Sequence, residues 1–316
     1  MSPRSGHHPL EFEPIYKQRV WGGRALEADF GRELPDGEAP FGEAWDVVDR
    51  PDDRVRVRSG PLAGTTLHDL WNGRRSELFG DGLDGLGEDF PLLLKLLDAR
   101  RHLSVQVHPP ASAAARFGGE PKSEMWYVLS ADPGAKLFVG LRDGVTREGF
   151  EAAMAAGETE GTLHVIEPRA GQFLFIPSGR LHAIGAGLRL FEMQQNSDTV
   201  YRVFDWNRVG LDGAPRELHE EQALACIDFS DVAPAMGEPD GEVLVDCEHF
   251  RVERWVLEPG ASRGGGEARF ALFTVVEGEV QCGGAAFRPG GSFLLPVGGA
   301  PLEAREGAVM LRSTLP

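Results

Sequence analysis

Four side chains in the middle of the chain have the types and spacing of a metal-ligand set: Gln106, His108, Glu124 and His182. They offer one amide oxygen, two imidazoles and one carboxylate. This mixture of donors suits a divalent metal with an open coordination position, and zinc is the first choice because it accepts both nitrogen and oxygen ligands. A protein with such a site usually performs chemistry on a small molecule that carries oxygen atoms.

Two of the four residues lie on one predicted strand. Apolar and polar residues alternate over 104–108, and Pro109 ends the alternation. Because side chains two positions apart on a strand point the same way, Gln106 and His108 face the same side. Glu124 begins a further apolar run, which predicts an adjacent strand.

His182 ends the pattern G-x5-P-x-G-x2-H, which begins at Gly171. A strand that runs into this turn can place the histidine at the wall of a β-barrel. Taken singly, each candidate also has an ordinary explanation, since a histidine beside a proline is more often a surface or hydrogen-bonded residue than a ligand. Gln106 could equally hydrogen-bond a neighbour, and Glu124 could be a solvated charge. The prediction rests on the joint pattern.

Composition favours a protein built of strands and turns. The 316 residues suffice for two domains or one large all-β unit, and 41 Gly with 22 Pro suit tight turns better than a helix bundle. The formal net charge of −17 argues against nucleic-acid binding and against a polybasic membrane surface. An acidic protein that binds a phosphorylated substrate must concentrate positive charge locally, which gives weight to Arg and Lys near the metal motifs.

Cysteine content and hydropathy indicate the cellular compartment in which the protein is expected. Cys226, Cys247 and Cys282 are far apart and form no CxxC pair, so they support neither a thiolate zinc site nor a disulfide framework. Residues 1–13 contain no apolar signal-peptide core, and no run of eighteen apolar residues occurs. These features predict a cytoplasmic protein without a membrane partner. The acidic surface neither requires nor forbids a dimer, so a monomer or a homodimer is expected.

An internal echo predicts two β-barrels or jelly rolls in tandem. Residues 169–177 and 288–296 each contain a glycine turn that feeds an apolar strand ending at proline. The second copy follows a predicted hairpin with its bend at Glu277-Gly278. It has no counterpart of His182, so only the first barrel can hold the metal.

The expected fold class is therefore mainly β with a few short helices. A metal-binding catalytic domain is predicted over 1–233, a smaller β-domain without metal ligands over 241–316, and a linker in the Pro- and Gly-rich segment 234–241. The predicted strands are 42–50, 54–58, 90–98 and 188–195, of which 90–98 is apolar enough to be covered on both faces, and the predicted helices are 66–79 and 148–156.

Several blocks of the sequence resemble the type I mannose-6-phosphate isomerases, also called phosphomannose isomerases, in their short bacterial form. The blocks run in family order from about residue 16 to about residue 208 and are together highly specific. They are Trp21-Gly22-Gly23, Leu103–Pro109, Lys122–Tyr127, Pro177–Ala183, and Glu192–Asp198 continuing into Tyr201–Trp206.

The resemblance implies a cupin fold, that is, a jelly-roll β-barrel, with one zinc ion per chain held by Gln106, His108, Glu124 and His182. It also implies interconversion of the phosphosugars mannose 6-phosphate and fructose 6-phosphate. There are two departures: the family's Gly-Glu-x-Trp-Glu-x-Ser stretch reads Gly42–Val48 here, with Asp for the second Glu and no Ser, and residues beyond 241 match weakly. The role of the C-terminal third therefore stays open.

An aldose–ketose isomerisation moves a proton between adjacent carbons through an enediol or enediolate. The site needs a base and a stabiliser of negative charge on the oxygens, and zinc with an open position suits the second task as a Lewis acid. Glu192 is the expected base, although it could instead orient a ligand or hold a loop. Arg202 is the active-site arginine implied by the resemblance, and its fork suits the phosphate or the enediolate. Lys122 is expected to contact the phosphate or a hydroxyl, an exposed strand-end lysine being the alternative.

Two other classes of function compete with the isomerase. Cupin oxygenases usually have His-x-His followed closely by Glu, whereas here Gln106 takes the first position and Glu124 lies sixteen residues beyond His108. A sugar-binding or regulatory cupin would retain the metal without turnover, and the presence of both Glu192 and Arg202 argues against it. A nucleotide-sugar transferase has no supporting motif. The sequence therefore predicts an isomerase.

Overall fold

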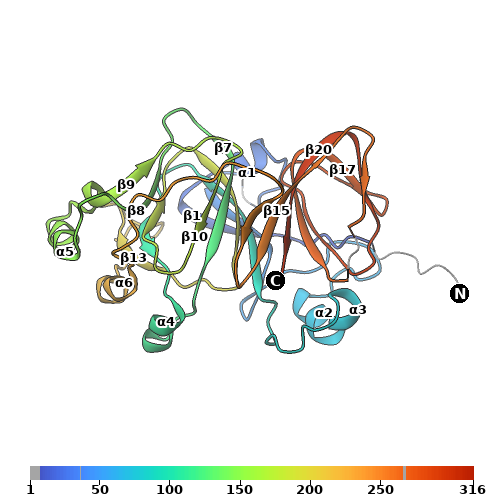
Figure 1. Ribbon diagram of the computed structural model, residues 1–316, viewed down its shortest axis with the longest axis horizontal. Coiled ribbons are helices and arrows are strands. Elements are labelled where there is room, and N and C mark those ends of the chain that lie inside the picture. Colours follow the sequence, from blue (N-terminus) through green and yellow to red (C-terminus); the bar gives the residue numbers. More distant parts are fainter. Residues whose placement is uncertain (1–7, 36, 266–267) are drawn as a thin grey trace, which may run out of the picture.

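The computed structural model describes residues 8–35, 37–265 and 268–316. Its strands form sheets of six, five and seven strands and one small two-stranded hairpin, β3 (Asp49–Arg50) with β4 (Asp53–Arg54). Figure 1 shows two β-rich lobes side by side, with α5 (Arg147–Ala156) and α6 (Glu220–Cys226) at the outer end of one lobe and α4 (Ala111–Phe117) below its strands. The predicted mainly-β fold with a few short helices is confirmed.

Two of the sheets enclose the interior of the first barrel. The six-stranded sheet has the order β1 (Ile15–Gly23), β2 (Phe41–Val47), β5 (Leu92–Ala99), β12 (Leu188–Gln195), β7 (Glu124–Ala131) and β10 (Phe173–Ile176). The five-stranded sheet has the order β13 (Tyr201–Phe204), β6 (Val105–Val107), β11 (His182–Ile184), β8 (Leu137–Leu141) and β9 (Leu163–Ile166). Apolar side chains of both sheets, among them Leu97 and Leu190 of the first and Leu137 and Ile184 of the second, pack into one core between them.

The predicted strand 90–98 is β5, and all of its residues are buried. Leu94 lies in the core shared with Phe250 and Leu311 of the C-terminal lobe, whereas Leu97 lies in the core of the first barrel. The prediction that this apolar run is covered on both faces is therefore confirmed.

The helices partly follow the prediction. The segment 148–156 is α5, which begins after Thr146, whose hydroxyl accepts the backbone N–H of Gly149. The segment 66–79 forms two helices, α2 (Leu67–Gly73) and α3 (Arg75–Leu78), rather than one. The chain leaves the helical conformation at Arg74, whose φ is −138° and ψ 32°. A further single turn, α1 (Ala25–Ala28), and the 3₁₀ turn η1 (Thr159–Thr162) complete the set.

The predicted N-terminal strands are present in altered form. Residues 42–50 fall in β2 and β3, whereas 54–58 contributes only the end of β4 and isolated bridges from Arg56 to Thr66 and from Val57 to Phe12. In the part of the chain that the structure describes, no helix is long and apolar enough to cross a membrane.

The C-terminal lobe holds the seven-stranded sheet. Its strands are β14 (Val243–Asp246), β15 (Arg251–Leu257), β16 (Ser262–Arg263), β17 (Ala271–Cys282), β18 (Ala285–Phe287), β19 (Ser292–Leu295) and β20 (Leu302–Thr314). The predicted hairpin at Glu277-Gly278 is wrong, because β17 continues through these residues. Its register against β20 shifts there, and Gly278, with φ +74°, lies so close to Gly307 that a Cβ would stand 2.2 Å from the Gly307 carbonyl oxygen. The glycine therefore serves a bulge and a close strand approach, not a turn.

The division into residues 1–233 and 241–316 stays a proposal. All strands of the C-terminal sheet lie within the second range, which supports it. The apolar core at the boundary is nevertheless continuous, since Phe250 and Leu311 pack together with Leu94 of the first lobe.

Candidate active site and metal centre

Strand pairing brings distant residues of the five-stranded sheet into one row. In β6, Gln106 stands opposite His182 of β11 on one side and opposite Arg202 of β13 on the other. Residues directly opposite one another in an antiparallel pair point to the same face, so the three side chains are neighbours. Two predicted ligands and the predicted arginine therefore share one wall.

The predicted metal ligands form a buried cluster. His108 Nε2 lies 3.4 Å from Glu124 Oε2, and His182 Nε2 lies 3.6 Å from Glu124 Oε1. Gln106 reaches the same group, with its Nε2 3.3 Å from His182 Nε2. Because the two ends of an amide are interchangeable by a half-turn, Gln106 can present its oxygen at that point. The ligand atoms of the three titratable members all lie within 4.8 Å of one another.

The two imidazoles are held in the tautomer that a metal needs. His108 Nδ1 donates a hydrogen bond to the Thr199 carbonyl, and His182 Nδ1 donates to the Arg180 carbonyl, each at 2.9 Å. A carbonyl can only accept, so each Nε2 keeps its lone pair, and His108 Nε2 is buried with no hydrogen-bond partner among the described residues. Burial lowers the pKa of His108 to about 4 and also lowers the pKa of His182. Both are neutral at pH 7, as ligands must be, so the donor set fits a divalent ion.

Lys122 is buried beside the cluster, with its Nζ 2.8 Å from Glu124 Oε2. Burial alone would raise the pKa of Glu124, but Lys122 and the two histidines outweigh it and hold that pKa well below its ordinary value. Glu124 is therefore a carboxylate, the form in which it can bind a metal. The alternative that Lys122 is an exposed strand-end lysine is wrong.

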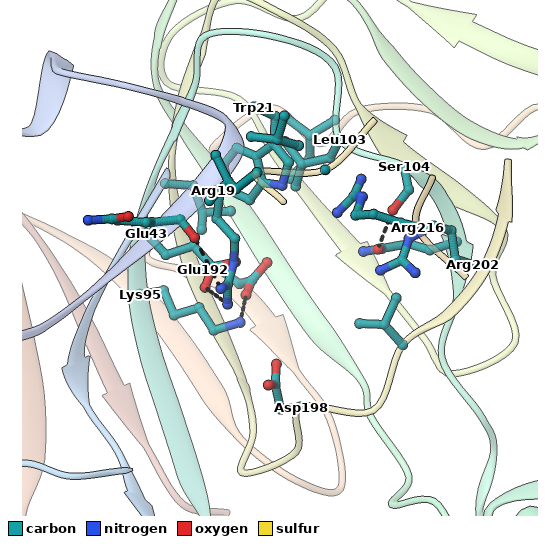
Figure 2. Close-up of a pocket in the computed structure, with 18 of the residues that line it drawn as sticks. Arg19, Trp21, Glu43, Lys95, Leu103, Ser104, Glu192, Asp198, Arg202 and Arg216 are labelled. Carbon is teal, nitrogen blue, oxygen red and sulfur yellow. Dashed lines mark hydrogen bonds and ion pairs between the residues drawn. The ribbon is translucent and has the colours of Figure 1, made fainter. Parts of the chain in front are cut away.

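A cavity of about 560 Å³ reaches the cluster at Gln106 and is also lined by Lys122, whereas His108, Glu124 and His182 are not among its lining residues. Its size is within the range usual for small-molecule sites. Charged side chains dominate its wall: Arg19, Glu43, Lys95, Lys122, Glu192, Asp198, Arg202, Asp212 and Arg216. Figure 2 shows Glu43, Lys95 and Glu192 on one side of this cavity and Ser104, Arg202 and Arg216 on the other.

Glu192 lies in a second cross-strand row, on the six-stranded sheet. It stands opposite Lys95 of β5 and Trp126 of β7. Its Oε1 lies 3.0 Å from Lys95 Nζ, and its Oε2 accepts the Trp126 indole N–H at 3.0 Å. Burial alone would lower the pKa of Lys95, but the carboxylates of Glu192 and Glu43 outweigh it and raise that pKa. Lys95 is thus protonated at neutral pH and lies beside the candidate base.

Sequence reasoning did not assign a role to Lys95, Arg19 or Glu43. Glu43 Oε2 accepts from Arg19 Nη2 at 2.9 Å and from the Trp45 indole at 2.7 Å. Burial would raise the pKa of Glu43, but Lys95 and Arg19 outweigh it and lower that pKa. A signal for Lys95 was present, since it is the one charged residue between Phe90 and Leu97.

Asp46, which replaces the second Glu of the family motif, does not line the cavity. Its Oδ2 pairs instead with Arg32 Nη2 at 2.6 Å.

The guanidinium of Arg202 uses only part of its hydrogen-bonding capacity within the described residues. Its Nη1 donates to the Glu217 carbonyl at 2.7 Å, while its Nε is buried and has no hydrogen-bond partner within the described residues. Burial and the neighbouring charge of Arg216 lower the pKa of Arg202, which still leaves it a cation at neutral pH. Arg216, which pairs with Asp205 at 2.7 Å, is a second cation on the same wall that sequence reasoning missed.

His219 predicts a pH dependence of stability. Its Nδ1 accepts the backbone N–H of Arg202 at 3.1 Å, and burial together with the Arg202 charge lowers its pKa. The unfolded chain then binds more protons below its ordinary pKa of about 6.5, so stability is lost as the pH falls through that region. We expect the free energy of unfolding of His219→Gln to fall less steeply than that of the wild type between about pH 7 and pH 5. Urea unfolding at several pH values measures both slopes, and equal slopes would contradict the assignment.

One other group in the described part of the chain has ligand types, namely Asp49, His68 and Asp89. Arg54 already sits there, with its Nε 3.3 Å from Asp49 Oδ1 and its Nη2 3.9 Å from Asp89 Oδ1. A cation is therefore already supplied by the chain, and we interpret this group as an ion-pair network.

The fold and the site together define a cupin with a buried candidate metal centre beside a charged cavity. The family profile "Phosphomannose isomerase type I, catalytic domain" matches residues 10–129. The chain is 36% identical over 303 residues to a mannose-6-phosphate isomerase of Bacillus subtilis, which covers 92% of this chain and 93% of the relative. It therefore belongs to the type I mannose-6-phosphate isomerase family.

Two further comparisons agree. A mannose-6-phosphate isomerase of Streptococcus mutans is 36% identical over 299 residues, covering 91% of this chain and 92% of the relative. The crystal structure of a mannose 6-phosphate isomerase from Bacillus subtilis superimposes with a TM-score of 0.85 at 30% identity, over 98% of this chain and all of that one. The similarity therefore extends through both lobes.

Proposed function

We propose that this protein is an aldose–ketose isomerase that interconverts mannose 6-phosphate and fructose 6-phosphate. Family membership supports the reaction. The observation that carries the proposal is one cavity whose wall includes Gln106 of the metal-ligand cluster, the ion pair of Glu192 with Lys95, and the cationic side chains of Arg202 and Arg216. An isomerisation through an enediolate needs a base and a stabiliser of negative charge on the oxygens, and a phosphorylated substrate also needs cationic contacts for its phosphate.

The metal we propose is one zinc ion per chain, held by Gln106, His108, Glu124 and His182. The neutral imidazoles, the charged carboxylate and the Nε2 of His108, which has no hydrogen-bond partner among the described residues, support this ligand set. When bound, the ion would supply a Lewis acid for negative charge that develops on the oxygens of the substrate.

For proton transfer between the two carbons we propose Glu192. It is buried and lines the cavity, and its Oε1 lies 3.0 Å from Lys95 Nζ. Its other oxygen accepts the indole N–H of Trp126, which fixes the plane of the carboxylate. Lys95 would stabilise the carboxylate between proton transfers, because it holds its own proton firmly.

For the phosphate we propose the opposite wall, where Arg202 and Arg216 lie. The chain as a whole carries a net charge of −17, so an anionic substrate needs such a local concentration of cations. Lys122 would stand near the sugar oxygens instead, because its ammonium is committed to Glu124.

A coupled assay tests the proposed function. Purified protein is given mannose 6-phosphate and fructose 6-phosphate is detected, before and after chelation and after return of zinc. We expect turnover that disappears with the chelator and returns with the metal. A folded, zinc-loaded protein without turnover would favour the sugar-binding cupin, and iron-dependent oxygen uptake would favour the oxygenase.

Replacing Arg202 with alanine should lower kcat/KM by about 10²- to 10³-fold, because a charge-assisted contact to the phosphate or enediolate is lost in a buried site. Arg202→Lys should recover only part of this loss, since lysine lacks the fork. Steady-state kinetics on both variants measure the effect. An unchanged kcat/KM in the alanine variant would exclude a catalytic or phosphate-binding role.

A further inference from the structure

The orientation of His182 depends on the backbone of Arg180. His182 Nδ1 donates to the Arg180 carbonyl at 2.9 Å, and on the other side of the ring Nε2 faces Glu124. The imidazole is thus fixed at both ends. A shift of the Arg180 peptide would turn the ring and move Nε2 away from the cluster.

The side chain of Arg180 is itself held by a forked ion pair. Its Nε lies 2.8 Å from Asp231 Oδ2 and its Nη2 lies 2.8 Å from Asp231 Oδ1. The remaining nitrogen, Nη1, donates to the Phe175 carbonyl at 2.7 Å. Both charged side chains are only 16% exposed. A two-pronged, mostly buried pair of this kind restrains geometry far more than a surface ion pair.

Asp231 is fixed to the barrel in turn. Its carbonyl accepts the backbone N–H of Leu141 at the end of β8, the strand that pairs with β11, which carries His182. The same segment binds the turn before His182 a second time, because the Asp228 N–H donates to the Gly179 carbonyl at 2.9 Å. The segment 228–231 is therefore hydrogen-bonded both to the end of β8 and to the turn before His182.

We propose that Arg180 and Asp231 are positioning residues for the metal ligand His182. The fork holds the turn so that the Arg180 carbonyl keeps His182 Nε2 directed at the metal. This inference rests on the proposed metal site. Neither residue lines the cavity, so the pair acts on metal affinity and ligand geometry and makes no substrate contact. Outer partners of metal-bound histidines typically change metal affinity by about 10- to 100-fold.

Two variants test the proposal in the full-length protein. Asp231→Asn keeps the shape but removes the charge and one acceptor, and Arg180→Lys keeps the charge but cannot form the fork. For both we expect the zinc dissociation constant, measured by competition with a chromogenic chelator, to rise by about 10-fold or more. Glu151→Gln, which breaks the exposed pair with Arg147 on α5, is the matched control and should bind zinc like the wild type.

A second readout separates positioning from simple stabilisation. Cobalt in place of zinc reports ligand geometry through its visible absorption, and we expect an altered spectrum in both variants but not in the control. Variants with a lower melting temperature but unchanged zinc affinity and cobalt spectrum would overturn the proposal. If the folded wild type binds neither zinc nor cobalt, the proposed metal site itself fails, which is a separate result.

Discussion

Replacing His182 with alanine should abolish zinc binding at the proposed site and lower kcat/KM by at least about 10³-fold, the equivalent of several kcal/mol of Lewis-acid stabilisation. The imidazole is fully buried, faces the Glu124 carboxylate at 3.6 Å and is fixed by the Arg180 carbonyl. Among the described residues, the only other imidazole in the cluster is that of His108, which is itself a proposed ligand. Metal content by elemental analysis and turnover in the coupled assay measure the two losses on one sample.

His102→Ala is the matched control for that experiment. His102 also makes a hydrogen bond with the backbone, accepting from the Ala186 N–H, but unlike His182 it is only partly buried and lies outside the ligand cluster. We expect this variant to keep its metal and most of its activity. His108→Ala should behave like His182→Ala. A folded His182→Ala protein that is free of metal and fully active would remove the metal from the mechanism.

Replacing Glu192 with glutamine should lower kcat by about 10²- to 10⁴-fold, the usual contribution of a positioned base, while the zinc content stays unchanged. Glutamine has the shape of glutamate, so it can still accept the Trp126 indole N–H. It cannot take up the proton, and it leaves Lys95 without its partner at 3.0 Å. Exchange of the substrate's transferred hydrogen with deuterated solvent should slow in parallel with kcat.

Glu253→Gln is a control of closely similar chemistry. Glu253 in the C-terminal lobe also accepts an indole N–H, that of Trp255 at 3.2 Å, and pairs with a buried cation, Arg312, at 2.7 Å. It lies outside the cavity. We expect this variant to lose stability but to keep kcat. If Glu192→Gln turns over within about twofold of the wild type, another group is the base.

Local patterns account for what the sequence predicted correctly. Strand alternation over 104–108, the apolar run 90–98 and the helix near 148–156 depend on residues close in the chain, and each is present in the structure. Histidine and glutamate are common metal ligands, so a cluster of His108, Glu124 and His182 could be expected before any fold was known.

Local patterns failed where a partner strand decided the outcome. Glu277-Gly278 has turn composition, yet β20 runs alongside and makes the glycine a bulge within one long strand. Likewise, nothing near Lys95 in the chain predicts Glu192 as its partner. That pairing follows from the order β5–β12–β7 and its register.

The sequence by itself thus determined the donor types, the strands that carry them and the family. Only the tertiary structure decided which charges face one another: Lys95 with Glu192, Arg19 with Glu43, and Arg180 with Asp231. The physical reason is that in an antiparallel barrel the neighbours of a side chain come from strands distant in sequence. Because these side chains are buried, their neighbours also determine which of them are charged, and a short stretch of sequence does not contain that information.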